Sequence, residues 1–266
     1  MPLPSVRRLA VPAAGALLIL ATSCATPPAA TGAGPVIGTP PAGTTSTTST
    51  TSTTTTTPDA SPTPAPAASL LRRGDSGPEV LALQERLDSL GYWLGEPDGA
   101  FGTLTEQAVY ALQGAAALSR DGIVGPATSA ALDAGTRPRA RSGSGTVTEI
   151  DRDAGLISFV RDGQVQLVLH TSTGTFEPYR FAGRSLLADT PGGSFTVSWA
   201  VDGVRDGSLG ELYRPRYFHP DGIAVHGYPS VPAYPASHGC ARVTPAAMDM
   251  VWARDLMPRS SEVLVF

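Results

Sequence analysis

The stretch VTEIDRDAGLISFVRDGQVQLVLH, residues 147–170, contains short apolar or alternating runs separated by charged and glycine-containing segments. Runs of this length, bounded by turn residues, are typical of β-strands. Similar runs continue to the C-terminus. In chain order they are Val147–Ile150, Leu156–Val160, Gln164–His170, Ser194–Val201, Gly222–His226 and Glu262–Phe266. The sequence therefore predicts a mainly β domain over residues 146–266.

One helix is expected to interrupt these strands. Thr244 is a favourable N-cap, and Pro245 suits the first helical position. The apolar residues that follow recur at helical spacing, namely Met248, Val251, Trp252 and Leu256. We expect a compact β domain with one or more packed helices, and Cys240 falls in the loop that leads towards this helix.

Upstream, residues 70–134 have the pattern of a small helical module. Ser76-Gly77-Pro78-Glu79 has the form of a capping box, and apolar residues follow at helical spacing until Gly91. Thr103 is expected to open a second helix, and Gly125-Pro126 a third. The segment 98–102 is echoed at 121–125. Residues 135–145, rich in Arg, Gly and Ser, are the expected linker to the β domain.

The N-terminus indicates export. Arg7 and Arg8 precede an apolar run, Leu9–Leu20, that is shorter than the roughly 20 residues of a membrane span and fits a signal peptide. We assign residues 1–24 to a signal peptide with a lipobox-like end, and Cys24 to lipidation. Residues 25–69, rich in Pro, Thr, Ser and Ala, are the expected disordered linker. The protein would be lipid-anchored on the outer face of the cytoplasmic membrane and in the cell wall, or, with ordinary cleavage, secreted.

Composition excludes one class of partner and singles out one residue. The net charge is −4 and all 19 basic residues are scattered arginines, so no nucleic-acid-binding surface is indicated. Processing at Cys24 leaves Cys240 as the unpaired thiol of an exported chain. Most cysteines in oxidising compartments are paired, so Cys240 is a candidate nucleophile.

The surroundings of Cys240 could supply the groups that thiol acyl transfer needs. Its segment is Ser237-His238-Gly239-Cys240-Ala241-Arg242, and His226-Gly227 precedes Cys240 by fourteen residues. His226 could accept the thiol proton and later return it to the leaving amine. A backbone carbonyl, for which Gly227 is our candidate, would orient the other ring nitrogen.

Two further roles follow from the same segment. The N–H groups of Gly239 and Cys240 could hold the oxyanion of a tetrahedral intermediate. Arg242 could bind a substrate carboxylate or organise the loop, and a buried structural salt bridge is its alternative.

A zinc site is the chemical alternative at this place. His226, His238 and Cys240, with His219 or His170, have suitable donor atoms. No His-x₃-His or Cys-x₂-Cys pair accompanies them, so we predict no metal. His170 and His219 are otherwise expected to be ordinary strand-end or loop residues.

The pattern His-x₁₀-Ser-His-Gly-Cys-x-Arg resembles the signature of the L,D-transpeptidases, the YkuD-like catalytic domain. Thr190-Pro191-Gly192-Gly193-Ser194-Phe195 and Ser172-Thr173-Gly174 resemble two further motifs of that family. The resemblance implies a β-sandwich-like fold, Cys240 as nucleophile and His226 as base. It also implies a substrate loop formed by Ser237, His238, Gly239 and Arg242, with Tyr217 as an aromatic residue beside the site.

The helical region resembles the peptidoglycan-binding module type 1, whose fold is a three-helix bundle. The resemblance lies in the Leu83-Gln84 pair after Leu81, in Gly91-Tyr92, and in the two segments that begin at Asp98-Gly99 and Asp121-Gly122. Leu112-Gln113 stands where that family usually has Phe-Gln. A spacer bundle without a ligand is the alternative for this module.

Together these resemblances imply a multidomain enzyme of the cell wall. Cys240 would attack a peptidoglycan stem tetrapeptide, release D-Ala and hold a thioester, and a neighbouring stem amine would complete a 3→3 cross-link. Carbapenems would acylate the same thiol, and neither metal nor cofactor is implied. The alternatives are an L,D-carboxypeptidase and a non-catalytic wall-binding lipoprotein.

Overall fold

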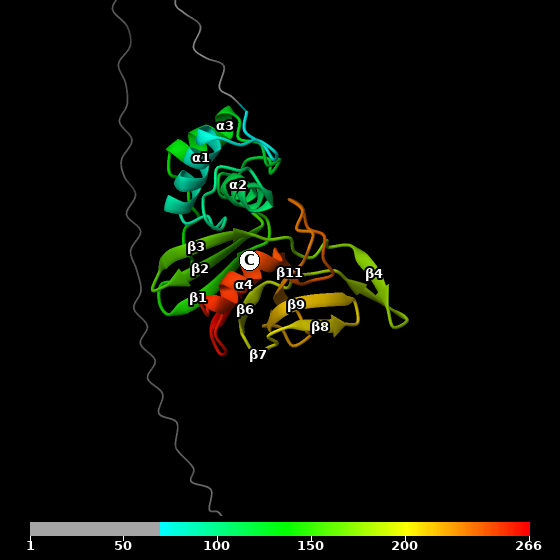
Figure 1. Ribbon diagram of the computed structural model, residues 1–266. Helices are drawn as coiled ribbons and strands as arrows, with labels where there is room; N and C mark the ends of the chain where they lie inside the picture. The colour runs from blue at the N-terminus through cyan, green and yellow to red at the C-terminus, as the bar shows by residue number, and fades with distance from the viewer. Residues whose placement is uncertain (1–69) are drawn as a thin grey trace, which may run out of the picture. The chain divides into compact units, whose positions relative to one another are not determined.

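The structure, a computed structural model, describes residues 70–266 (Figure 1). The predicted signal peptide, the lipidation site Cys24 and the predicted linker 25–69 lie outside the described residues. Among the residues that are described, no helix is both long and apolar enough to cross a membrane. The described chain consists of a helical module followed by a mainly β domain.

Two five-stranded sheets build the β domain. In spatial order, the first sheet contains β3 (Gln164–His170), β2 (Leu156–Arg161), β1 (Thr146–Asp151), β12 (Glu262–Val265) and β6 (Gly193–Thr196). The second contains β11 (Ala241–Val243), β10 (Ala224–Gly227), β9 (Gly210–Tyr217) and β7 (Trp199–Ala200), with β8 (Val204–Gly207) paired to β9. A separate hairpin joins β4 (Pro178–Phe181) to β5 (Arg184–Leu187).

The predicted strand Ser194–Val201 is wrong as a single element. Its first part is β6 in the first sheet, and its last part is β7 in the second. The change of sheet occurs at two adjacent residues. Val197 donates its N–H to Ser261, next to β12, whereas Ser198 donates to Tyr217 of β9. Apolar spacing did not reveal the crossing because it depends on these partners, which are distant in the sequence.

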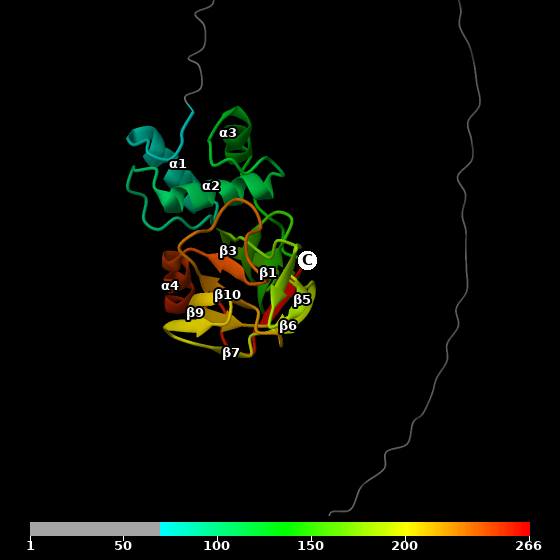
Figure 2. The same cartoon turned by 90° about the vertical axis from the view of Figure 1, so that its right-hand side faces the viewer.

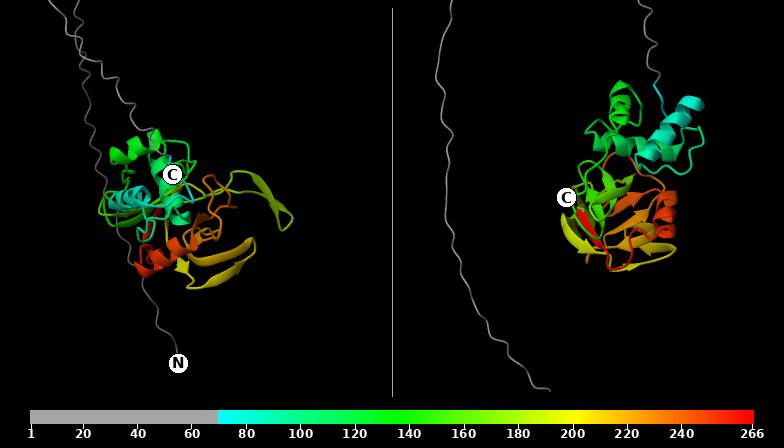
Figure 3. Two further views of the ribbon diagram at one scale, coloured as in Figure 1. Left: turned by 45° about the horizontal axis from the view of Figure 1, so that its top comes forward. Right: turned by 90° about the vertical axis from the view of Figure 1, so that its left-hand side faces the viewer.

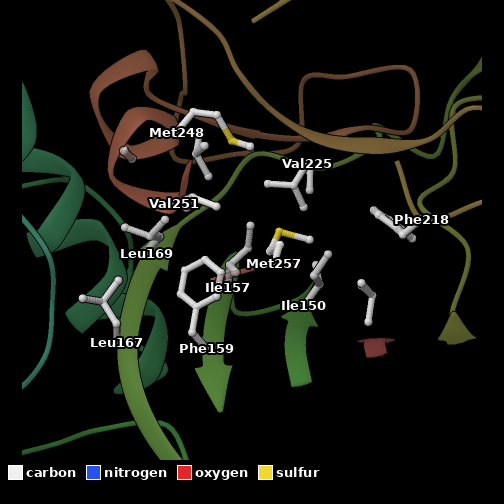
Figure 4. Close-up of a cluster of buried hydrophobic side chains, with 14 of the residues drawn as sticks. Ile150, Ile157, Phe159, Leu167, Leu169, Phe218, Val225, Met248, Val251 and Met257 are labelled. Atoms are coloured by element: carbon white, nitrogen blue, oxygen red, sulfur yellow. The ribbon is translucent and has the colours of Figure 1, made fainter. Parts of the chain in front are cut away.

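The two sheets and one helix enclose a common core. Helix α4 (Pro245–Ala253) starts as predicted, and Thr244 Oγ1 accepts the N–H of Ala247 at 3.1 Å. Figure 4 shows Met248 and Val251 of α4 above Ile157 of the first sheet, with Val225 of the second sheet beside them. These side chains are fully buried. They belong to a larger buried cluster drawn from both sheets and α4, and removal of this apolar surface from water stabilises the domain.

The helical module contains α1 (Pro78–Ser89), α2 (Thr103–Ala115) and α3 (Pro126–Asp133). The predicted capping box at Ser76 is wrong. The N-cap of α1 is Gly77, with φ +124°, and no side chain caps the helix. Ser76 lies one residue too early to cap the helix and instead pairs with Ala100 as an isolated bridge.

Two buried glutamines explain the internal echo of the sequence. Gln84 Nε2 donates to Asp98, to the carbonyl of Ala100 and to Thr105. Gln113 Nε2 makes the equivalent bonds to the three residues that occupy the same places in the second segment, Asp121, Ile123 and Thr128. Each glutamine oxygen accepts the N–H of the glycine in its own segment. The two similar segments therefore provide the same set of hydrogen-bond partners, each for the side-chain amide of one buried glutamine.

The helical module packs directly against the first sheet. The carbonyl of Gly91 accepts the N–H of Val168 in β3 at 2.8 Å, and the N–H of Trp93 donates to the Val168 carbonyl at 3.2 Å. Val168 and Leu156 belong to the apolar core of the module. At the end of α2, a Cβ on Gly114 would lie 2.2 Å from the carbonyl oxygen of Ala154, so only glycine fits there.

Candidate active site

Cys240 lies directly before β11, and strand alternation sets its direction. Ala241 and Val243 of β11 are buried in the core. Because successive side chains of a strand point to opposite faces, Cys240 and Arg242 share the other face. The parallel β10 pairs its His226 with Arg242. His226 and Cys240 are therefore diagonal neighbours on the face that points away from the core.

His226 is buried, with 4% of its surface exposed. Its Nδ1 lies 2.9 Å from the carbonyl oxygen of Gly227. A carbonyl oxygen can only accept, so Nδ1 carries the hydrogen in this contact and the neutral ring keeps a lone pair on Nε2. This carbonyl is the one that the sequence suggested. A Cβ on Gly227 would lie 2.8 Å from a ring carbon of Tyr213, which explains the glycine.

Both proposed reacting groups are neutral at rest. Burial lowers the pKa of His226 to about 4, and the charge of Arg242 adds to this effect, while the Gly227 carbonyl opposes it. Burial also raises the pKa of the Cys240 thiol, against the lowering effects of a backbone hydrogen bond from Ala224 and of Arg242. Here desolvation outweighs those neighbours, so the proton must be transferred during the reaction.

The turn before Cys240 is held by its own side chains. Ser237 Oγ donates to the carbonyl of Cys240 and accepts the N–H of Gly239 at 3.0 Å. The predicted oxyanion role of the Gly239 N–H therefore does not fit this hydrogen bonding. Ser237, predicted to bind substrate, uses its hydroxyl to shape the turn. Gly239 has φ +145°, and a Cβ there would lie 2.6 Å from the Asp189 carbonyl oxygen.

Arg242 makes contacts that organise the loop. One guanidinium nitrogen donates to the carbonyl of Ala236 at 2.9 Å, and its Cζ lies 4.1 Å from the ring centre of Tyr228. These contacts fit the loop-organising role rather than a salt bridge. Arg242 also faces the cavity described next.

A cavity of about 900 Å³ lies over this face. All the predicted active-site residues except Gly227 line it: Cys240, His226, Ser237, His238, Gly239, Arg242 and Tyr217. Tyr217 stacks on Trp199, with ring centres 4.2 Å apart, and Arg205 lies over that stack. The exposed His238 packs edge-on against Tyr179, and their ring centres lie 4.7 Å apart.

Two hairpins that the sequence did not predict contribute to the walls of this cavity. They are β4–β5, which carries Tyr179 and Leu186, and β8–β9, which carries Arg205 and Leu212. Figure 3 (left) shows both hairpins extending from the same side of the β domain. β5 and β8 are largely exposed, so they lack the apolar alternation that reveals a half-buried strand.

The side chains of the alternative zinc site do not form a metal-binding group. Among residues 70–266, no three His, Cys, Asp or Glu side chains lie close enough together to hold a metal ion. His170 is the last residue of β3 and His219 follows β9, as expected of strand-end and loop residues. Cys240 is a free thiol.

Comparison with known proteins agrees with this arrangement. The sequence-family model of the L,D-transpeptidase catalytic domain (YkuD) matches residues 145–265. The family model of a peptidoglycan binding domain matches residues 76–132. The crystal structure of the L,D-transpeptidase (residues 123–326) from Xylanimonas cellulosilytica is 49% identical, with a TM-score of 0.73. The match covers 77% of this chain and 100% of that one. The chain belongs to the L,D-transpeptidase family.

A second similarity is confined to part of the chain. The N-acetylmuramoyl-L-alanine amidase CwlL of Bacillus licheniformis is 41% identical over 91 residues, 33% of this chain. A probable amidase of the same organism is 41% identical over 76 residues. The chain spans only 25% and 22% of the length of these two relatives.

Two motifs of this L,D-transpeptidase family member converge on the Cys240 turn. Thr190, fully buried, donates its hydroxyl to the Gly239 carbonyl at 2.7 Å and accepts the N–H of Gly174. The carbonyl of Thr173 accepts the N–H groups of Ala236 and Ser237. Sequence reasoning identified these motifs but gave them no role at the site. Their hydrogen bonds fix the backbone on both sides of His238.

Proposed function

We propose that this chain is a cysteine-dependent L,D-transpeptidase that forms 3→3 cross-links in peptidoglycan through a thioester. The observation that carries the proposal is the pairing of β10 with β11, which gives His226 and Cys240 one cavity-facing side of the sheet. The contact of His226 Nδ1 with Gly227 supports a role for Nε2 as the base. The shared family supports the reaction class.

In the proposed first half-reaction, His226 Nε2 takes the thiol proton as the sulfur of Cys240 bonds to a carbonyl carbon of the donor stem. That carbonyl belongs to the third residue, a diamino acid. The carbonyl oxygen becomes an oxyanion, for which the Cys240 N–H is the proposed donor. As the intermediate collapses, the bond to D-Ala breaks and His226 returns the proton to the departing amine. A thioester on Cys240 remains.

In the second half-reaction, an amine of a neighbouring stem attacks the thioester. His226 accepts a proton from that amine, the carbon–sulfur bond breaks, and the proton returns to the thiolate. The Cys240 thiol is regenerated and no redox step occurs. Neutral resting states suit this cycle, because each half begins with a proton transfer to a free imidazole.

The remaining assignments belong to the same proposal. Residues 70–134 form a three-helix peptidoglycan-binding bundle, residues 135–145 a linker, and residues 146–266 the catalytic domain. His238, Arg242 and Tyr217 contact the stem peptide from the cavity walls. The protein works outside the cytoplasmic membrane, through a lipid anchor on Cys24 or as a secreted form.

The decisive experiment incubates the purified chain with a disaccharide-tetrapeptide and identifies the products by mass spectrometry. We expect dimers joined 3→3, together with free D-Ala. Release of D-Ala without dimers would instead indicate the L,D-carboxypeptidase, and absence of both products would indicate the non-catalytic wall-binding lipoprotein. A carbapenem should add one adduct to the wild-type chain and none to Cys240→Ala.

A further inference from the structure

The segment between the two proposed catalytic residues has a proline at every third position. These are Pro229, Pro232 and Pro235, within residues 228–236, the proline loop. Proline has no N–H to donate, and proline-rich extended backbone makes no internal hydrogen bonds. Carbonyl groups of such a loop, once covered by other elements, need donors from elsewhere in the chain.

Four consecutive carbonyls of the proline loop each accept a hydrogen bond from a side chain. In chain order, Val231 accepts from Gln107 at 2.9 Å, Pro232 from His170 at 2.9 Å, Ala233 from Arg120 at 2.8 Å and Tyr234 from Ser172 at 2.8 Å. His170 and Ser172 belong to the β domain. Gln107 and Arg120 belong to the helical module.

The donors of the helical module are themselves fixed. Gln107 lies within α2, and Figure 2 shows the orange segment that contains the proline loop arching towards this helix. A second nitrogen of Arg120 donates to the carbonyl of Asp153 in the β domain at 2.9 Å. Tyr110 of α2 lies against the ring of His170, with centres 5.3 Å apart. The module and the β domain therefore grip the loop together.

The proline loop leads without interruption into the turn that carries Cys240. Arg242 holds the carbonyl of Ala236, and Ser237 is tied to Thr173. Because Ala236 belongs to the proline loop and also bonds to Arg242 and Thr173, a displaced loop would disturb the bonds that hold the turn. His226, in contrast, is held by the paired strands of the second sheet.

We propose that the helical module is a structural part of the active site, in which Gln107 and Arg120 act as positioning residues that set Cys240 against His226. This inference rests on the proposed function. It gives the module a role separate from wall binding, and that role applies even to a small substrate that never contacts the module.

The test uses the purified full-length chain and a small β-lactam, which needs no contact with the wall. Gln107→Glu replaces the amide that donates to Val231 with a carboxylate of the same shape. Arg120→Gln replaces the guanidinium that donates to Ala233 with a shorter amide side chain. Arg73→Gln is the matched control, because Arg73 lies in the same module and its side chain is largely exposed. Acylation of Cys240 is followed by mass against β-lactam concentration, which separates the limiting rate from the apparent affinity.

We expect Gln107→Glu and Arg120→Gln to lower the limiting acylation rate by about tenfold or more, because small displacements of reacting groups have large effects on rate. The apparent affinity should change little, Arg73→Gln should match the wild type, and Arg120→Lys, which can still donate to Ala233, should recover part of the rate. Amide hydrogen exchange in residues 228–240 should rise in the two slow variants.

Wild-type acylation rates in both folded variants would overturn the inference while leaving the proposed function intact. A wild-type chain that takes no β-lactam would instead contradict the proposed function. In that case, hydrogen exchange tests whether the module holds the proline loop, since unchanged protection in the Gln107→Glu and Arg120→Gln variants would refute it.

Discussion

His226 and His170 occupy similar surroundings in two different parts of the molecule. Both are buried, with 4% and 3% of their surface exposed, and burial lowers the pKa of each to about 4. Each places one ring nitrogen 2.9 Å from a backbone carbonyl. A buried histidine with a strongly lowered pKa is often taken as a sign of a catalytic site. These two show that this sign alone does not identify a base.

The difference lies in which nitrogen is used and in what faces the ring. His226 uses Nδ1, which leaves the lone pair of Nε2, and it lines the cavity beside Cys240. His170 uses Nε2 to hold the proline loop, and Tyr110 lies against its ring. In the proposed mechanism His226 transfers protons, whereas His170 holds the backbone of the proline loop.

Amide substitutions at the two histidines give the largest expected contrast. Asn has its amide nitrogen near the place of Nδ1 and Gln near that of Nε2, so His226→Asn and His170→Gln can both keep their carbonyl contacts. We expect His226→Asn to lower turnover of the disaccharide-tetrapeptide by about 10²–10⁴-fold, the usual contribution of a general base. His170→Gln should retain most activity, and an equal loss in both would break the comparison.

The free energy of unfolding should depend on pH because the pKa values of both histidines are lowered in the folded chain. Their folded pKa of about 4 lies below the usual value of about 6.5, so the unfolded chain binds protons first as the pH falls. The stabilisation is complete above pH 6.5 and is lost between pH 6.5 and 4, by about 3 kcal/mol per histidine. Urea unfolding across this range should show that His170→Gln loses less stability than the wild type. Parallel curves would contradict the assignment.

The charge of Arg242 affects His226 and Cys240 but is not among the influences on His170. It lowers the pKa of both Cys240 and His226, and Arg242→Gln should therefore raise both. Iodoacetamide alkylates the thiolate of Cys240. In Arg242→Gln, the midpoint of the alkylation rate against pH should move to higher pH, and the rate at pH 8 should fall a few fold. The pKa of His170 should stay near its wild-type value, as followed by NMR of the ring protons.

The smallest expected effect concerns the ring contact between His170 and Tyr110, whose centres lie 5.3 Å apart. Tyr110→Leu keeps an apolar side chain against His170 but removes the aromatic pair, which is worth about 1 kcal/mol. Denaturant unfolding should show a loss of this size. No loss, or a loss also in the His170→Gln background, would mean that the ring contact is not the source of the stabilisation.

Local signals predicted part of the fold well. Thr244 and Pro245 mark the start of α4 because capping is decided by adjacent residues. The echo at Asp98 and Asp121 indicated a repeated structure, although the part played by Gln84 and Gln113 became visible only with the fold. The hairpins β4–β5 and β8–β9 were missed because β5 and β8 are largely exposed, and exposed strands have little apolar pattern.

The sequence suggested the residues of the candidate site and the contact of His226 with the Gly227 carbonyl, but not the hydrogen bonds of the turn before Cys240. Short sequence motifs were enough to select Cys240 and His226. The turn bond from Gly239 to Ser237 depends on backbone geometry that no residue pattern specifies. Gln107 and Arg120 were not selected at all, because their partners lie more than a hundred residues further along the chain.

The backbone hydrogen bonds of Gly91 and Trp93 to Val168 cover part of the β3 edge of the first sheet. β3 is the outermost strand there, and a bare outer strand offers unpaired N–H and C=O groups to other chains. A catalytic domain produced without its helical module would leave β3 bare, together with the apolar Val168 and Leu156. Such a fragment should self-associate, and truncation studies that seek a minimal enzyme should retain residues 70–134 for solubility.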